Sequence, residues 1–155
     1  MKYAGPSNFA VEVLDGTGSE IGLLANVIGS YSGSQFQQLP SAGQYVFQVQ
    51  ASAPWTITLQ NFPAWPSGQT PNGPITGKGP AALALQLNGG LVTFAMTHDG
   101  KSNFAVTFND ASDNEMDLLA NVIGPFNGSQ AEGVPAPGVY LLNVEADGNW
   151  SISVQ

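Results

Sequence analysis

The chain has 155 residues, a net charge of −8, and neither arginine nor cysteine. Its three lysines cannot supply the cationic surface that nucleic acid or an anionic membrane requires, and the lack of cysteine excludes disulfides and thiolate metal sites. Only 9% of the residues are charged, against about 25% in ordinary soluble domains, so the surface must consist largely of uncharged polar residues. This composition is typical of a secreted or cell-surface β-protein, and no apolar run approaches the roughly 20 residues of a membrane span.

The sequence repeats itself with an offset of 95 residues. Residues 7–60 align without a gap on residues 102–155, and 25 of the 54 aligned positions are identical. The segment Leu-Leu-Ala-Asn-Val-Ile-Gly at 23–29, for example, returns at 118–124. An internal repeat of this kind predicts two copies of one fold.

Apolar and polar residues alternate through the first copy. The period of two predicts antiparallel strands, each with one buried face, at 8–14, 21–28, 45–51 and 55–60. Trp55 is in phase with the buried face of the last of these segments, as is its counterpart Trp150 in the second copy. Both tryptophans are therefore expected in the core.

A stretch with five prolines, 61–82, follows the first copy and predicts an extended, irregular linker. Two further strands, 83–87 and 91–98, are then expected before the second copy begins. Their counterparts would fall at or before residue 3, so the first copy lacks its opening strands. The sequence leaves three explanations open: the chain is truncated, the linker folds back over the gap, or another chain supplies the strands.

These patterns predict an all-β fold of two homologous antiparallel β-sandwich units, jelly-roll or Ig-like in outline. The first unit spans 1–60 and is incomplete at its start, residues 61–82 form the linker, and the second unit spans 83–155.

The second copy resembles a family of tandem β-sandwich repeats in exported bacterial and archaeal proteins. The resemblance rests on these motifs: His98 to Phe104 (HDGKSNF), Leu118 to Asn121 (LLAN), Gly124, Gly138 to Tyr140 (GVY) and Ala146 to Trp150 (ADGNW). In outline the chain is similar to the pre-peptidase C-terminal domains. That similarity implies an accessory, non-catalytic extracellular module, and it implies no catalytic residue or cofactor.

The single histidine, His98, is followed directly by Asp99. Neighbouring residues of a strand point to opposite faces, so the two are not expected to form a catalytic pair. The sequence shows no other set of nucleophile, general base and orienting group that would converge on one site. The chain is therefore not expected to be an enzyme.

Calcium is the one cofactor for which the sequence offers ligands. Four carboxylates, Asp110, Asp113, Glu115 and Asp117, fall within eight residues and supply the hard oxygen ligands that Ca²⁺ prefers. The alternative is a turn in which Asp110, like its counterpart Asp15, caps the backbone.

Three aromatic residues outside the shared core pattern are candidates for contact with a sugar or a protein. Trp65 lies in the linker, and Tyr31 and Phe126 are expected in loops after Gly29 and Gly124. We expect adhesion or ligand binding within a surface or secreted assembly. The alternatives are a self-assembling fibre or oligomer subunit that a neighbouring chain completes, and a carbohydrate-binding accessory module.

Overall fold

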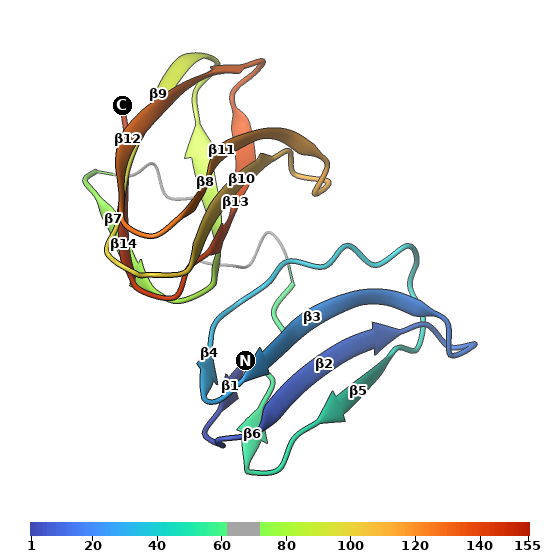
Figure 1. The fold of residues 1–155 in the computed structure, drawn as a ribbon. Helices are drawn as coiled ribbons and strands as arrows, with labels where there is room; N and C mark the ends of the chain where they lie inside the picture. Colours follow the sequence, from blue (N-terminus) through green and yellow to red (C-terminus); the bar gives the residue numbers. More distant parts are fainter. Residues whose placement is uncertain (62–71) are drawn as a thin grey trace. The chain divides into compact units, whose positions relative to one another are not determined.

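The computed structural model describes residues 1–61 and 72–155. These residues form strands and connecting turns, and they contain no helix that could cross a membrane. The chain divides into two compact units, Met1–Leu59 and Gln60–Gln155 (Figure 1). Each unit contains two antiparallel sheets that share one hydrophobic core, so the predicted pair of β-sandwiches is confirmed.

Unit 2 is a sandwich of two four-stranded sheets. Its sheets have the orders β11-β10-β13-β8 and β12-β9-β14-β7. The strands are β7 (Ile75–Lys78), β8 (Ala81–Leu87), β9 (Gly90–His98), β10 (Asn103–Asn109), β11 (Glu115–Ile123), β12 (Phe126–Val134), β13 (Gly138–Glu145) and β14 (Asn149–Val154).

Unit 1 has two three-stranded sheets, with the orders β3-β2-β5 and β4-β1-β6. The strands are β1 (Lys2–Tyr3), β2 (Asn8–Leu14), β3 (Glu20–Ile28), β4 (Tyr31–Ser32), β5 (Val46–Gln50) and β6 (Trp55–Thr56). The sheet orders match those of unit 2 if β7 and β8 are removed from it.

The 95-residue offset extends to the pairing of the strands. Asn8 pairs with Ile28 as Asn103 pairs with Ile123, and β2 and β10 shift register against their partners at equivalent positions. A bulge adds a residue to one strand and bends it, so the two copies bend at the same places. The repeat therefore preserves register as well as the apolar pattern.

The cores follow the predicted alternation. In β2 and β10 every second residue is buried, and Phe9 and Phe104 are both fully enclosed. The core of unit 1 is smaller, because the side chains of its fifth strand, Phe47 and Val49, are only partly buried.

Strand β4 of unit 1 is much shorter than its counterpart β12. In unit 2, β12 pairs along all nine of its residues with Gly90–His98. In unit 1, β4 pairs with β1 over Lys2–Tyr3 and Tyr31–Ser32, and Gly33 and Met1 add a pair of hydrogen bonds beyond the end of both strands.

The segment expected to be a linker without strands contains one. Strand β7 occupies Ile75–Lys78, and β8 begins at Ala81, so the expectation of irregular structure throughout 61–82 is wrong. Exposed Thr76 and Lys78 alternate with half-buried Ile75 and Gly77, but this alternating run is too short to be recognised among the prolines.

Candidate functional site

The main difference between the two units lies along one side of each sandwich. In unit 2 this side is closed, because β8 pairs with β13 and β7 pairs with β14. In unit 1 the counterparts of β13 and β14 are β5 and β6, and each is the last strand of its sheet among the described residues. We call the outer edges of β5 and β6 the open side of unit 1.

Burial shows what the two additional strands do for unit 2. Trp150 on β14 is 4% exposed, whereas its counterpart Trp55 on β6 is 48% exposed. Leu142 on β13 is fully buried in the core of unit 2, whereas its counterpart Phe47 is only partly buried. The expectation that Trp55 lies in the core is therefore wrong, although it holds for Trp150.

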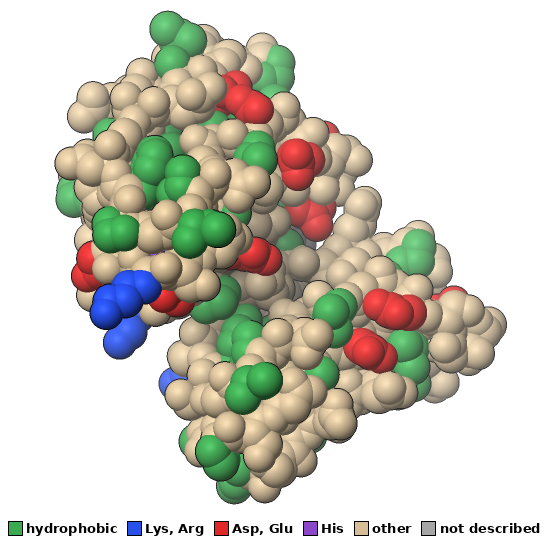
Figure 2. Space-filling view, in the orientation of Figure 1, with side chains coloured by type: hydrophobic (Ala, Val, Ile, Leu, Met, Phe, Trp, Pro, Cys, Tyr) green, Lys and Arg blue, Asp and Glu red, His purple; other side chains and the backbone are tan. Residues whose placement is uncertain are grey.

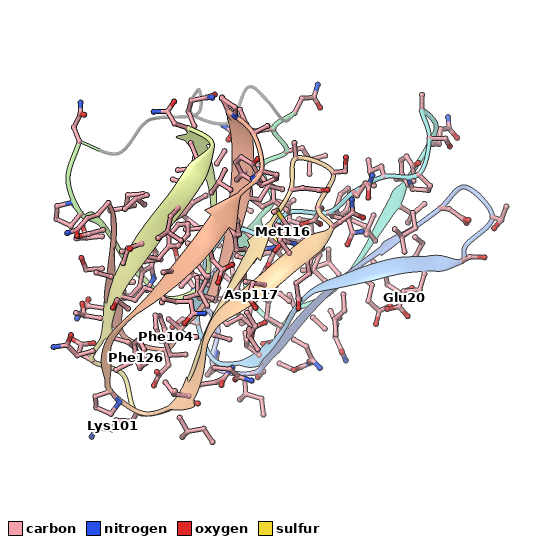
Figure 3. All side chains as sticks on the ribbon, turned by 90° about the horizontal axis from the view of Figure 1, so that it is seen from above. Glu20, Lys101, Phe104, Met116, Asp117 and Phe126 are labelled. Carbon is pink, nitrogen blue, oxygen red and sulfur yellow. The ribbon has the colours of Figure 1, made fainter. Side chains whose placement is uncertain are left out.

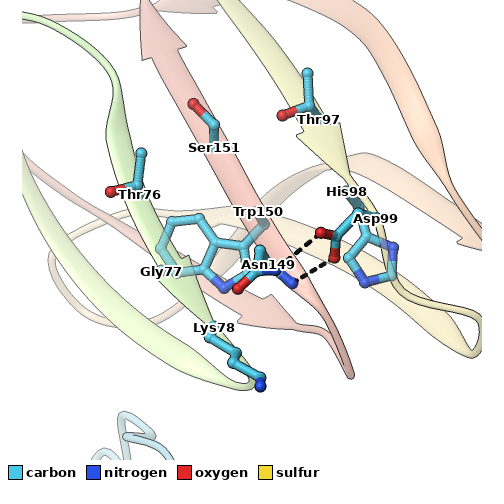
Figure 4. Close-up of a pocket in the computed structure, with 9 residues that line it drawn as sticks. All are labelled: Thr76, Gly77, Lys78, Thr97, His98, Asp99, Asn149, Trp150 and Ser151. Atoms are coloured by element: carbon cyan, nitrogen blue, oxygen red, sulfur yellow. Dashed lines mark hydrogen bonds between the residues drawn. The ribbon is translucent and has the colours of Figure 1, made fainter.

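Strand β7 covers Trp150 directly. The indole Nε1 donates a hydrogen bond of 2.8 Å to the carbonyl oxygen of Gly79, and the ring lies against Gly77 (Figure 4). A Cβ atom on Gly77 would collide with this ring, so only glycine allows the strand to approach so closely. Trp55 has the same place in unit 1 but no strand of this kind beside it among the described residues.

The open side has the chemistry of an incomplete sheet. A terminal strand presents a row of backbone N–H and C=O groups that can pair with another strand. Strand β5 has the sequence VFQVQ and carries no charged residue that would repel such a partner. Its side chains alternate between exposed and half-buried positions, so one face of an added strand would enter the partly formed core.

A second cluster of polar groups lies at one end of unit 2, where two Asp-Gly turns interlock. Asp99 accepts hydrogen bonds from the backbone N–H and the side-chain amide of Asn149, at 2.7 and 2.8 Å (Figure 4). Asp147 accepts hydrogen bonds from the backbone N–H groups of Lys101 and Ser102, both at 3.0 Å. We call this pair of turns, together with His98, the Asp-Gly clamp.

His98 is the buried centre of the Asp-Gly clamp. Its ring stacks on Phe104 with centroids 4.7 Å apart, and Nδ1 lies 3.0 Å from the carbonyl oxygen of Gly124. Nε2 lies 3.2 Å from Oδ1 of Asp147 and 3.3 Å from the amide nitrogen of Gly148. With a proton on Nε2 the ring donates to Asp147, and without it the ring accepts from Gly148. Both ring nitrogens are thus used within the fold.

The hydrogen bonds in the clamp favour the ionised carboxylates. Those from the backbone N–H groups of Lys101 and Ser102 lower the pKa of Asp147. The side-chain and backbone bonds from Asn149 lower the pKa of Asp99 in the same way.

Unit 1 builds the same junction from other residues. Tyr3 takes the place of His98 and stacks on Phe9 with centroids 4.8 Å apart. Its hydroxyl lies 2.9 Å from Oγ of Ser52, the residue equivalent to Asp147. A ring stacked on phenylalanine and one hydrogen bond across the loops are common to both units, which indicates a structural role for the clamp.

The four candidate calcium ligands have separate partners. Oδ1 of Asp110 accepts hydrogen bonds from the backbone of Ser112 and Asn114, as Oδ1 of Asp15 does in the equivalent turn of unit 1. Oδ1 of Asp113 accepts one from the side chain of Asn109. Burial raises the pKa of Asp113, which has a left-handed φ of 62°.

Asp117, the last of the four, belongs to a different contact, and Glu115 begins strand β11. In the described part of the chain, no three acidic or histidine side chains gather where they could hold a metal ion. Calcium binding stays a prediction, and calorimetry with Ca²⁺ and EDTA would test it.

Asp117 faces a second carboxyl group, that of Glu132 on β12. A hydrogen bond with Asp117 raises the pKa of Glu132, and the same bond lowers the pKa of Asp117. The side-chain amide of Gln130 also donates to Glu132 at 3.2 Å. The contact joins the end strands of the two sheets, β11 and β12.

The three candidate aromatic contacts have different positions. Tyr31 is 7% exposed in strand β4 and packs against Phe9, so the expectation of an exposed loop residue is wrong. Phe126 is the first residue of β12 and pairs with His98, so the expectation of a loop is wrong for it too. It is partly buried, and its ring centroid lies 5.7 Å from that of Phe104 (Figure 3). Trp65 lies outside the described residues.

The surface carries little charge apart from scattered acidic groups. On the face drawn in Figure 2, uncharged polar groups and backbone cover most of the area, with separate acidic side chains and a few basic ones. This agrees with the composition, and acidic side chains form no concentrated patch on that face.

Comparison with known protein families and with curated proteins gives no match. Among solved structures, the chain is similar to the pre-peptidase C-terminal domain of collagenase from Bacillus anthracis. The sequence identity is 15% and the TM-score is 0.42, and the alignment covers 53% of this chain and 87% of that domain.

Proposed function

We propose that the chain is a non-catalytic binding module of a secreted or cell-surface protein, and that it binds a protein partner along the open side of unit 1. One observation carries the proposal: the same fold, with the same register, has this side closed by two strands in unit 2, whereas no described residue closes it in unit 1. Addition of a strand to a sheet edge is an established way for β-proteins to bind extended segments.

The remaining features support a binding role over a catalytic one. The buried histidine uses both ring nitrogens within the Asp-Gly clamp, and unit 1 replaces it with Tyr3. The low content of charged residues supports an extracellular location, since the same surface built from serine, threonine, asparagine and glutamine is typical of exported β-proteins.

Amide hydrogen exchange would test whether the open side is free. Central strand amides exchange slowly because they open only with the whole fold, whereas the outward amides of an edge strand exchange with solvent. We therefore expect β13 to be better protected than β5 in the monomeric chain. Equal protection of β5 and β13 would contradict the proposal, because the edge would then already be covered within the chain.

Mass in solution tests the self-assembly alternative. If copies of the chain pair through the open side, sedimentation at high concentration will show oligomers, and Val46→Lys will dissociate them because a lysine blunts an edge. Ile28→Lys is the matched control: Ile28 is 85% exposed on β3, the end strand at the other side of the same sheet. A monomer at all concentrations would contradict the self-assembly alternative.

A further inference from the structure

We propose that the partner of the open side is an extended β-hairpin with the chemistry of Ile75–Leu87, carrying glycine opposite Trp55 and alternating apolar residues opposite β5. This inference rests on the proposed function and adds the identity of the partner segment. It follows from the hairpin that occupies the equivalent place in unit 2.

The first requirement concerns the strand beside β6. In unit 2, Gly77 pairs with Trp150 and Ile75 pairs with Ile152. The counterparts of these two partners in unit 1 are Trp55 and Ile57. A glycine opposite Trp55 would let the indole lie flat against the added backbone, as Trp150 does against Gly77, whereas any larger residue would collide with the ring.

The second requirement concerns the strand beside β5. Strand β8 pairs with β13 so that Leu83 is opposite Leu142 and Leu85 is opposite Tyr140. Leu85 and Leu87 belong to the core of unit 2, and Leu83 packs against it. An added strand with large apolar residues at this spacing would bury Phe47, which is only partly enclosed now.

The donor is not the corresponding hairpin of a second copy in its folded state. That hairpin is already paired with β13 and β14 of its own unit 2 through eleven residue pairs, seven on β8 and four on β7. Its release would expose Trp150 and the leucines of β8 in the donor, so the exchange would cover one open side and create another. A segment of the same chemistry that is not already paired meets the requirement without that cost.

The direct probe is a synthetic peptide with the sequence of residues 75–87, labelled with a fluorophore and titrated with the full chain. We expect saturable binding by anisotropy, with new amide protection at β5 and β6 and none at β13 and β14. A peptide with Gly77→Ala should bind at least about tenfold more weakly, because the added methyl group overpacks the site against Trp55.

A variant chain separates this mechanism from non-specific adhesion of an apolar peptide. Trp55→Ala removes the ring that excludes a side chain, so the two peptides should bind that variant with nearly equal affinity. Trp55 is half exposed, so the variant is expected to fold, and its circular dichroism verifies this.

Three results would overturn the inference: no saturable binding, equal binding of both peptides to the unmodified chain, or protection confined to unit 2. Failure of the peptide on a chain whose β5 amides exchange freely rejects this partner chemistry and leaves the proposed function standing. Slow exchange of β5 in the free monomer rejects both.

Discussion

Truncation of the two equivalent tryptophans should affect the two units very differently. Trp150 is 4% exposed and donates a hydrogen bond to Gly79, so Trp150→Ala creates a cavity and removes a bond. Replacement of a buried tryptophan by alanine costs about 3–5 kcal/mol of the free energy of unfolding. Trp55 is 48% exposed, so its side chain buries roughly half of its apolar area. Loss of that burial in Trp55→Ala should lower the free energy of unfolding by about 2 kcal/mol.

Hydrogen exchange with mass spectrometry measures this difference, because it reports on each unit separately. Protection should fall in β9 and β14 for Trp150→Ala and, by a smaller factor, in β1 for Trp55→Ala. Denaturation by urea, followed by circular dichroism, gives the corresponding change in the midpoint. If Trp55→Ala destabilises unit 1 by as much as Trp150→Ala destabilises unit 2, then Trp55 is covered in the free chain and the open side is closed.

Three further predictions concern the polar contacts of unit 2. Asp147→Ser alone should lower the melting temperature. Adding His98→Tyr should restore part of the loss, because the two residues then copy Tyr3 and Ser52 of unit 1. A double variant less stable than either single variant would contradict this expectation. Hydrogen bonds lower the pKa values of Asp99 and Asp147, so these two carboxylates stabilise the folded state fully above the normal aspartate pKa. This stabilisation is lost as the pH falls through the lowered pKa values, and melting temperatures measured between about pH 6 and 2.5 test the loss. Glu132→Gln should raise the melting temperature at pH 7, where ionisation of Glu132 beside Asp117 is unfavourable, and should have no such effect at pH 3.

The repeat made most of the fold predictable. Its offset identified the equivalent strands, and the alternation in 8–14 and 103–109 marked Phe9 and Phe104 as core residues, which they are. Periodicity could not predict that Trp55 is exposed, because the phase of a residue says which face it occupies and not whether another strand covers that face. Tyr31 was misplaced because the glycine before it suggested a loop, whereas pairing with Tyr3 holds it in a strand.

Polar contacts across the fold were harder to predict than the strands. The partner of His98 is Asp147, which is 49 positions away and belongs to the loop between β13 and β14. The sequence could have indicated it, since Tyr3 and Ser52 change together with His98 and Asp147 between the copies. The acidic residues after Asn109 suggest a calcium loop because they are close in sequence. The structure adds that backbone and amide groups donate to Asp110 and Asp113 separately, and calcium binding stays a prediction.

The side chains of the open side support the proposal that a partner strand covers it. Trp55 is 48% exposed and Phe47 and Val49 are only partly buried, yet each keeps the apolar character of its counterpart in unit 2. At an edge that always faced water, apolar side chains would add nothing to stability, and polar residues would reduce the risk of aggregation. Unit 1 therefore retains an apolar surface suited to a strand that the described residues do not contain, and binding of that strand would turn this exposed surface into a completed core.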